Sequence, residues 1–316
     1  MLEKKGTGLA FLSGPAPMLA GVIGIFGAVY LTVKYMANKK GYHRTSPRTL
    51  SVNPNDSVEL PLIKVTEISH DTKIFRFGLK EGHRLGLPVG QHINLKAKIR
   101  IDGKLVIRSY TPISSDDDLG FVDLLIKVYL PNERFPEGGK MTQHLNKMQL
   151  GDTISVAGPK GRIIYQRNGN FLIRGATAKD ENTRKSGVKH IGMIAGGSGI
   201  TPMMQIVRDV FKSSETTKLS LLFANQTEED ILLREEIEQV KTDYPERFNF
   251  MYTVDRPKDG WEYQSGFINK DMCASSLPIP GDDTMILICG PPPMVKFACL
   301  PNLKELGFTD DQIFVY

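Results

Sequence analysis

The sequence has little cysteine and no strong excess of charge. Its three cysteines, Cys273, Cys289 and Cys299, are odd in number and contain no CxxC pair. These features exclude a disulfide framework and a paired-thiolate metal site, and they favour a reducing compartment. The net charge of +5 is small, and lysine and arginine are interspersed with carboxylates. No nucleic-acid-binding surface is therefore predicted.

Charged residues are also missing from positions 6–33. Residues 18–33 would make a helix of about 24 Å, and the flanking residues of the apolar segment 16–36 extend that reach toward a bilayer. Basic residues follow directly, which by the positive-inside rule keeps the downstream chain in the cytosol: Lys34, Lys39, Lys40, Arg44 and Arg48. A cleaved signal peptide is the alternative, but no small-x-small site follows. We expect an uncleaved membrane-anchor helix in 1–36 and a polar linker over 37–56.

Residues 57–170 show the pattern of many short strands. Alternating apolar positions occur over 74–77 and 92–97, a long apolar run covers 121–129, and glycine-containing turns separate them. This pattern predicts a small antiparallel barrel, with one helix near 142–148. The charged, glycine-containing segment 171–187 reads as a linker between domains.

The pattern changes in residues 188–316. Buried-strand runs at 191–195, 219–223, 250–254 and 285–289 are separated by amphipathic stretches. Strands that alternate with helices predict an α/β domain with a doubly wound parallel sheet. Thr227 and Asp230 have the spacing of a capping box before an apolar segment.

A glycine turn and a proline-rich loop lie at the ends of two of these strands. Gly196-Gly197-Ser198-Gly199 stands between a strand and a helix, where Thr201 is expected as the N-cap. Such a turn suits a pyrophosphate, because free N–H groups and the helix dipole face the anion. The other reading is an ordinary tight turn. Residues 289–294 (CGPPPM) follow the last long strand, at the edge where ligands bind in such sheets.

Further binding groups occur in both domains. Asp255 closes a strand and can accept hydrogen bonds from a ribose diol, although a solvated turn is nearly as good an explanation. Arg108-Ser109-Tyr110-Thr111 offers a guanidinium fork, a ring and hydroxyls. The segment 138–142 (GGKMT) is a second anion cradle that opens a helix. Two phosphate-binding devices in two domains imply two dinucleotides.

These motifs occur in a fixed order together with GLPVGQH (86–92), TPISSD (111–116), FANQT (223–227) and ACLPNL (298–303). From about residue 61 to 316 the chain resembles the NADH-cytochrome b5 reductase family of the ferredoxin-NADP reductase superfamily. The resemblance implies a Greek-key β-barrel that binds FAD, followed by an α/β domain that binds NADH. Departures from the family pattern are small: Ser109, Ser198 and Tyr316 stand where proline, threonine and phenylalanine are common.

The resemblance also implies roles for individual residues. FAD would be held by Arg108, Ser109, Tyr110, Thr111, Lys127, Gly139, Lys140, Met141, Thr142 and Thr201. NADH would lie near Gly197, Gly199, Thr201, Asp255, Cys289, Gly290, Pro291, Pro292 and Met294. Thr201 and Cys289 would border the nicotinamide, Lys127 is linked to NADH, and His92 and Thr111 to hydrogen bonding around the flavin. His92 as a structural strand residue and Lys127 as a side chain that reaches solvent are alternatives. No metal is expected.

The implied function is a membrane-anchored NADH-cytochrome b5 reductase. FAD would take a hydride from NADH and pass single electrons to cytochrome b5, an acidic haem protein, in support of lipid metabolism such as fatty-acid desaturation and sterol synthesis. The expected location is the endoplasmic reticulum or the mitochondrial outer membrane, with the catalytic domains facing the cytosol. One alternative is a related flavoprotein that reduces a quinone or another haem protein. Another is a membrane-tethered adaptor without turnover.

Overall fold

The computed structural model describes residues 46–316, apart from 100–104, 134, 178–179 and 214. Ser46–Tyr316 forms one compact unit. The expected membrane anchor, 1–36, and the first part of the expected linker lie outside the described residues. Within the described ranges no helix is both long and apolar enough to cross a membrane.

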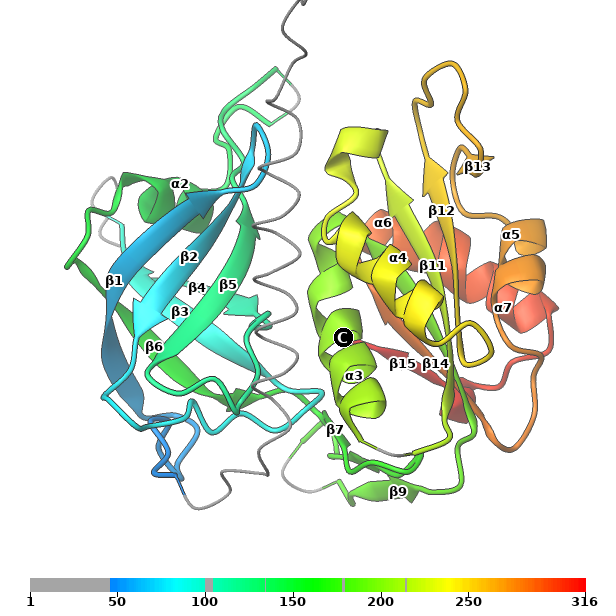
Figure 1. Ribbon diagram of the computed structural model, residues 1–316, viewed down its shortest axis with the longest axis horizontal. Coiled ribbons are helices and arrows are strands. Elements are labelled where there is room, and N and C mark those ends of the chain that lie inside the picture. Colours follow the sequence, from blue (N-terminus) through cyan, green and yellow to red (C-terminus); the bar gives the residue numbers. More distant parts are fainter. Residues whose placement is uncertain (1–45, 100–104, 134, 178–179, 214) are drawn as a thin grey trace, which may run out of the picture. The chain divides into compact units, whose positions relative to one another are not determined.

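The first half of this unit is an antiparallel sheet that curls around its own core (Figure 1). Its strands are β1 (Ser57–Glu67), β2 (Thr72–Gly78), β3 (His92–Lys98), β4 (Leu105–Tyr110), β5 (Phe121–Lys127) and β6 (Thr153–Lys160), in the order β4-β3-β6-β1-β2-β5. Alternate side chains such as Phe75 and Phe77 in β2 are buried, as the period-two pattern predicts. Helix α2 (Lys140–Lys147) lies at one end and begins two residues before the predicted helix. The antiparallel domain is confirmed.

Part of the expected linker belongs to this domain. Leu50 is buried in the barrel core, and the Thr49 N–H donates to the Arg84 carbonyl oxygen at 2.9 Å. The segment around Leu50 therefore packs on the barrel instead of forming a free tether. The segment 171–187, expected as an interdomain linker, also has structure: β7 (Ile163–Tyr165), β8 (Phe171–Ile173) and β9 (Thr183–Lys185) form a small antiparallel sheet.

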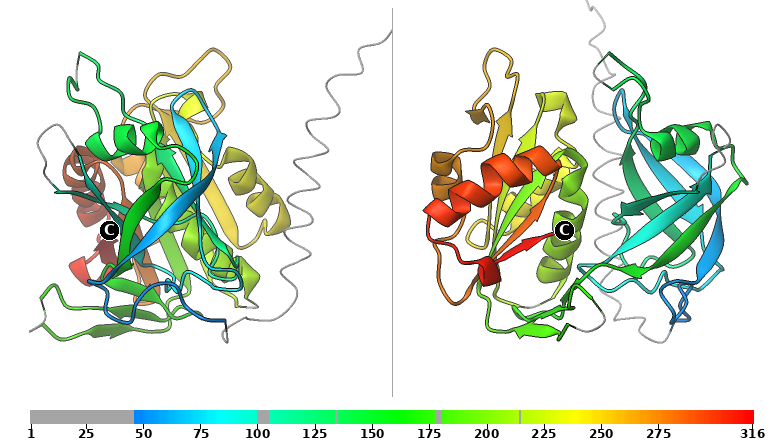
Figure 2. Two further views of the ribbon diagram at one scale, coloured as in Figure 1. Left: turned by 90° about the vertical axis from the view of Figure 1, so that its left-hand side faces the viewer. Right: turned by 180° about the vertical axis from the view of Figure 1, so that it is seen from behind.

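The second half is a parallel sheet with helices on both faces. Its strands are β10 (His190–Gly196), β11 (Lys218–Asn225), β12 (Phe248–Val254), β13 (Gln264–Ser265), β14 (Thr284–Cys289) and β15 (Ile313–Val315), in the order β13-β12-β11-β10-β14-β15. Helices α3 (Ile200–Lys212) and α4 (Arg234–Asp243) cover one face, and α5 (Lys270–Ser276), α6 (Pro292–Met294) and α7 (Leu300–Glu305) lie on the other (Figures 1 and 2). Short helical turns complete the domain: η1 (Gly197–Gly199), η2 (Glu228–Asp230), η3 (Val295–Cys299) and η4 (Asp310–Gln312). The predicted parallel α/β domain is confirmed.

Two helix starts differ from the sequence prediction. Helix α3 has Gly199 at its N-cap, because η1 runs directly into it, and the Thr201 hydroxyl donates to the Ser198 carbonyl oxygen at 3.1 Å from inside the first turn. The prediction that Thr201 is the N-cap is wrong. The capping box of Thr227 and Asp230 is present, but it caps the N-terminus of the short turn η2 and not that of a longer helix. Leu233 then adopts a left-handed φ of 58°, so α4 starts only after it.

Candidate functional site

The barrel presents polar groups where β4 ends. Arg108 is exposed, and its Nη1 donates only to the neighbouring Ile107 carbonyl oxygen among the bonds described for it. The Ser109 hydroxyl donates to Asn94 Oδ1 at 2.9 Å, and burial raises the pKa of the half-buried Tyr110 phenol. At neutral pH this strand end therefore offers a guanidinium and two neutral hydroxyls.

Helix α2 packs against the same strand. Residues of α2 contact β4, and the N-cap position, Gly139, supplies no side-chain oxygen to the first N–H groups of the helix. Gly138 adopts a left-handed φ of 60°, and a Cβ there would lie 2.7 Å from the Tyr129 carbonyl oxygen. Only glycine fits this turn, and the glycine N-cap of α2 leaves the first helix N–H groups without a side-chain acceptor. Such a donor set fits a pyrophosphate. The Met141 side chain is buried in the barrel core, so only its backbone can take part.

In the α/β domain the glycine turn and the proline-rich loop are in direct contact. Strands β10 and β14 are neighbours, with Ala195 opposite Cys289. A Cβ on Gly199 would lie 2.1 Å from the Cys289 carbonyl oxygen, and a Cβ on Gly290 would lie 3.1 Å from the Gly196 nitrogen. The two backbones meet because these positions have no side chain. The structure therefore brings together two predicted motifs that are about ninety residues apart in the sequence.

The strand order reverses at this point. From β10 the chain proceeds outward through β11 and β12, whereas β14 lies on the opposite side of β10. Ligands of doubly wound sheets bind in the crevice at the carboxyl ends of such strands. Asp255 follows β12 at the same edge and is exposed; its N–H donates to the Asn225 carbonyl oxygen at 3.1 Å. Partial burial raises the Asp255 pKa, and the nearby Arg256 opposes that shift.

Cys289 lies beside the C-terminal residue. The Tyr316 N–H donates to the Ile288 carbonyl oxygen at 3.0 Å, and burial raises the pKa of the Tyr316 phenol. Burial also raises the pKa of the Cys289 thiol to about 11. The thiol is therefore protonated at neutral pH. It suits packing against a flat ring and does not suit nucleophilic attack.

The barrel and the α/β domain meet beside the glycine turn. Strand β5 contacts η1, and Lys127 at the end of β5 places its Nζ 2.6 Å from Asp230 Oδ1 and 2.8 Å from Asp71 Oδ2. Burial alone would lower the Lys127 pKa, but the hydrogen bonds and charges of Asp230 and Asp71 outweigh it, so the pKa is raised. The predicted site residue Lys127 is therefore a charged bridge between the domains.

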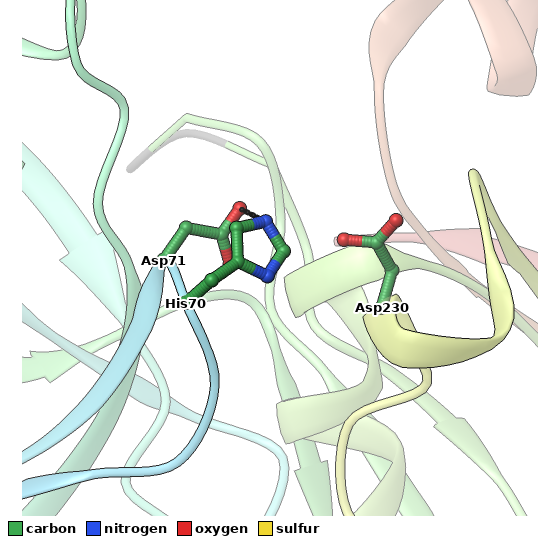
Figure 3. Close-up of side chains that lie close together, drawn as sticks. All are labelled: His70, Asp71 and Asp230. Atoms are coloured by element: carbon green, nitrogen blue, oxygen red, sulfur yellow. Dashed lines mark ion pairs between the residues drawn. The ribbon is translucent and has the colours of Figure 1, made fainter.

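Nothing in the sequence predicts Asp71 and Asp230 as partners of Lys127. Figure 3 shows them with His70, and ligand-type atoms of the three side chains lie within 4.8 Å of one another. The Lys127 ammonium already offsets the charge that the two carboxylates would offer to a cation. The one pattern in the sequence that singles out Asp230 is its capping-box spacing from Thr227. In the structure, Asp230 Oδ2 accepts from the Thr227 N–H and hydroxyl, and Oδ1 accepts from Lys127 Nζ.

The residues predicted near the flavin ring are His92 and Thr111. His92 begins β3 and is half-buried, and burial, followed by the charge of Lys160, lowers its pKa. The imidazole is neutral at pH 7 and has both a donor and an acceptor nitrogen. Thr111 directly follows β4 and is also half-buried. The roles of His92 and Thr111 beside a flavin ring stay predictions.

Comparison with known proteins assigns the two domains. Residues 59–165 match the oxidoreductase FAD-binding domain, and residues 193–300 match the oxidoreductase NAD-binding domain. NADH-cytochrome b5 reductase 2 from Rattus norvegicus is 54% identical over 268 residues, which are 84% of this chain and 96% of the relative. The Homo sapiens protein of that name is 52% identical over 277 residues, which are 86% of this chain and 99% of the relative. This chain belongs to the NADH-cytochrome b5 reductase family.

A solved structure supports the same assignment. The cytochrome b5 reductase domain of Ulva prolifera nitrate reductase superposes with a TM-score of 0.78 at 41% identity, covering 85% of this chain and 100% of that one. The predicted two-domain fold, the FAD and NADH cofactors and the oxidoreductase class are confirmed. The adaptor alternative does not agree with the family, whose members are named as reductases.

Proposed function

We propose that this protein is a membrane-anchored reductase that passes electrons from NADH to cytochrome b5. The observation that carries the proposal is the contact of β5 with the glycine turn η1, because it brings the FAD-binding domain against the turn where NADH is expected. Bound FAD would accept a hydride from NADH and release electrons singly to a haem. The relatives that match most of the chain are named for cytochrome b5 as their partner.

The chain's own residues bind and orient the cofactors. Arg108 and the N–H groups at the start of α2 would hold the FAD pyrophosphate. The η1 turn and the first turn of α3 would hold the NADH pyrophosphate, with Asp255 on a ribose. The neutral Cys289 thiol and Thr201 would border the nicotinamide. The neutral His92 imidazole and Thr111 would hold the hydrogen bonds around the flavin edge and move protons there.

The anchor and the location also belong to this proposal. The uncharged segment 6–33 followed by five basic residues supports an anchor whose catalytic domains face the cytosol. A reductase on the cytosolic face of the endoplasmic reticulum or the mitochondrial outer membrane would supply lipid-modifying enzymes such as desaturases and enzymes of sterol synthesis. The net charge of +5 favours encounter with an acidic haem protein.

Stopped-flow spectroscopy tests the acceptor. The purified full-length protein should be yellow and should be bleached by NADH, and cytochrome b5 should reoxidise it faster than a soluble quinone or an unrelated haem protein does. Equal rates with all acceptors would contradict the named partner. Colourless protein that does not oxidise NADH would contradict the enzyme itself.

Cell fractionation tests the anchor. The full-length chain should resist alkaline carbonate extraction from membranes, and protease added to intact organelles should digest its catalytic domains. Replacement of Ile23 and Ile25 by lysine should release the protein into the supernatant. Carbonate-soluble wild-type protein would contradict the anchor.

A further inference from the structure

A buried side-chain amide at the end of β11 has no hydrogen-bond partner within the part of the chain that the structure describes. Asn225 is 7% exposed, and neither its Oδ1 nor its Nδ2 has a hydrogen-bond partner among the described residues. An unsatisfied buried amide is costly, and native structures contain few. Asn225 belongs to the segment FANQT (223–227), and the family resemblance implies no role for it.

Asn225 lies where the dinucleotide motifs converge. In β11 the residue before it, Ala224, pairs with Gly196 of β10, and Asn225 itself pairs with Val254, the residue before Asp255. Strand β11 also contacts the glycine turn η1. Because side chains alternate along a strand, Asn225 shares a face with Leu221 and Phe223, which is the face covered by α3.

The polar groups around this strand end are already engaged. The Thr201 hydroxyl donates to the Ser198 carbonyl oxygen. Asp230 accepts from Thr227, and Gln226 Oε1 accepts from Arg256. The chain's own bonds therefore leave both functional atoms of the Asn225 amide available to a ligand.

We propose that Asn225 is a binding residue for NADH, whose side-chain amide hydrogen-bonds the ribose–pyrophosphate portion of the dinucleotide. This part of NADH offers what the amide lacks: phosphate and ribose oxygens accept from Nδ2, and a ribose hydroxyl donates to Oδ1. Asn225 would connect the pyrophosphate turn on β10 with Asp255 on β12. The inference rests on the proposed NADH-binding function and adds a residue to it.

The test measures binding and thermal stability of the full-length, FAD-loaded, oxidised protein. Asn225→Leu keeps the branched shape and removes both polar atoms. Without nucleotide, this variant should melt a few degrees higher than the wild type, because an unsatisfied amide is removed. Calorimetric titration should show weaker binding of NAD⁺ and of ADP-ribose by about 10- to 100-fold. ADP-ribose has the pyrophosphate and both riboses but no nicotinamide, so equal losses for the two ligands locate the contact.

Two further variants complete the test. Asn225→Asp should bind ADP-ribose more weakly than Asn225→Leu, because a carboxylate repels phosphate, and Asn225→Ala should reproduce the affinity loss if leucine does not fit. Asn249→Leu changes an exposed asparagine of β12 and should leave binding unchanged. Wild-type affinity for ADP-ribose in the Leu and Ala variants would overturn the inference, as would a lower melting temperature with unchanged affinity. If the wild type itself binds no NAD⁺, the proposed NADH-dependent function is contradicted, and with it the role of Asn225.

Discussion

The Lys127 ammonium lies 2.6 Å from the Asp230 carboxylate and joins the last residue of β5 to the turn η2 of the α/β domain. Asp71, at the turn between β1 and β2, binds the same ammonium at 2.8 Å. A single lysine is thus held by one carboxylate from each domain, and its strand β5 also contacts the glycine turn. This arrangement couples the relative position of the domains to the site where NADH is expected.

Asp230→Asn should weaken this bridge. The variant keeps an oxygen for Thr227 but loses the charge that faces a mostly buried ammonium, so we expect the free energy of unfolding to fall by about 1–2 kcal/mol. Urea denaturation measures this change. Glu229→Gln is the matched control, because Glu229 pairs with Lys258 at the exposed surface and surface pairs contribute little. Equal stability of Asp230→Asn and wild type would contradict a stabilising bridge.

The two glycines of η1 should respond to the same substitution to different degrees. A Cβ at Gly199 would lie 2.1 Å from the Cys289 carbonyl oxygen, so Gly199→Ala must push the turn η1 away from the end of β14. We expect it to cost more than about 2 kcal/mol and to abolish NAD⁺ binding. Gly197 has a φ of 52° with open space around it, so Gly197→Ala should cost about 1 kcal/mol. Thermal unfolding and calorimetry distinguish the two, and equal effects would refute the steric argument.

The sequence predicted the parts of this molecule that depend on local periodicity. Strands such as β10 and β14 are continuous apolar runs, and the α3 face formed by Met203, Ile206 and Val207 follows the helical period. The glycine turn could be predicted because a tight turn with free backbone N–H groups depends on glycines at adjacent positions in the sequence. That this turn lies close to the Cys-Gly-Pro loop could be predicted only on the assumption that the two strands belong to one parallel sheet.

Long-range pairing of polar side chains was not predictable in this way. Asp71 and Asp230 are ordinary turn residues in the sequence, and only the folded chain brings both to Lys127. The start of α3 at Ile200 also escaped prediction, because a 3-10 turn that continues into a helix removes the extended residue that a threonine cap requires. The orphaned amide of Asn225 is visible only as burial without a partner.

Cys289 should react slowly with alkylating reagents. Because burial raises its thiol pKa to about 11, the thiolate fraction is very small at pH 7 and should increase about tenfold per pH unit up to pH 10. Mass spectrometry after iodoacetamide pulses at pH 7, 8, 9 and 10 measures this dependence. The fully buried Cys299 is an internal reference that should stay unmodified in the folded protein. Rapid modification of Cys289 at pH 7 would contradict a protonated thiol.

The stability of the protein should fall as the pH drops below about 6.5, in part through His92. Burial and Lys160 lower the His92 pKa in the folded state, so the unfolded chain binds the proton first as the pH falls. The contribution is thus fully present above the unfolded pKa and is lost as the pH falls from there toward the folded pKa. His92→Gln should give a shallower decline of the melting temperature between pH 7 and pH 5. His144 shifts in the same direction, so its variant should show a similar effect and the double variant a larger one.

Asp255 should determine the preference for NADH over NADPH. Its exposed carboxylate follows β12 at the edge where a ribose is expected, and the adjacent Arg256 is directed to Gln226 Oε1 at 3.1 Å. A carboxylate there accepts hydrogen bonds from a ribose diol and repels a 2′-phosphate. Asp255→Ser should therefore lower the ratio of kcat/KM for NADH to that for NADPH by about tenfold, which corresponds to about 1.4 kcal/mol. Asp259→Ser, at an exposed position on the following loop, is the control that should keep the wild-type ratio. An unchanged ratio in Asp255→Ser would mean that the ribose is recognised by other groups at this edge.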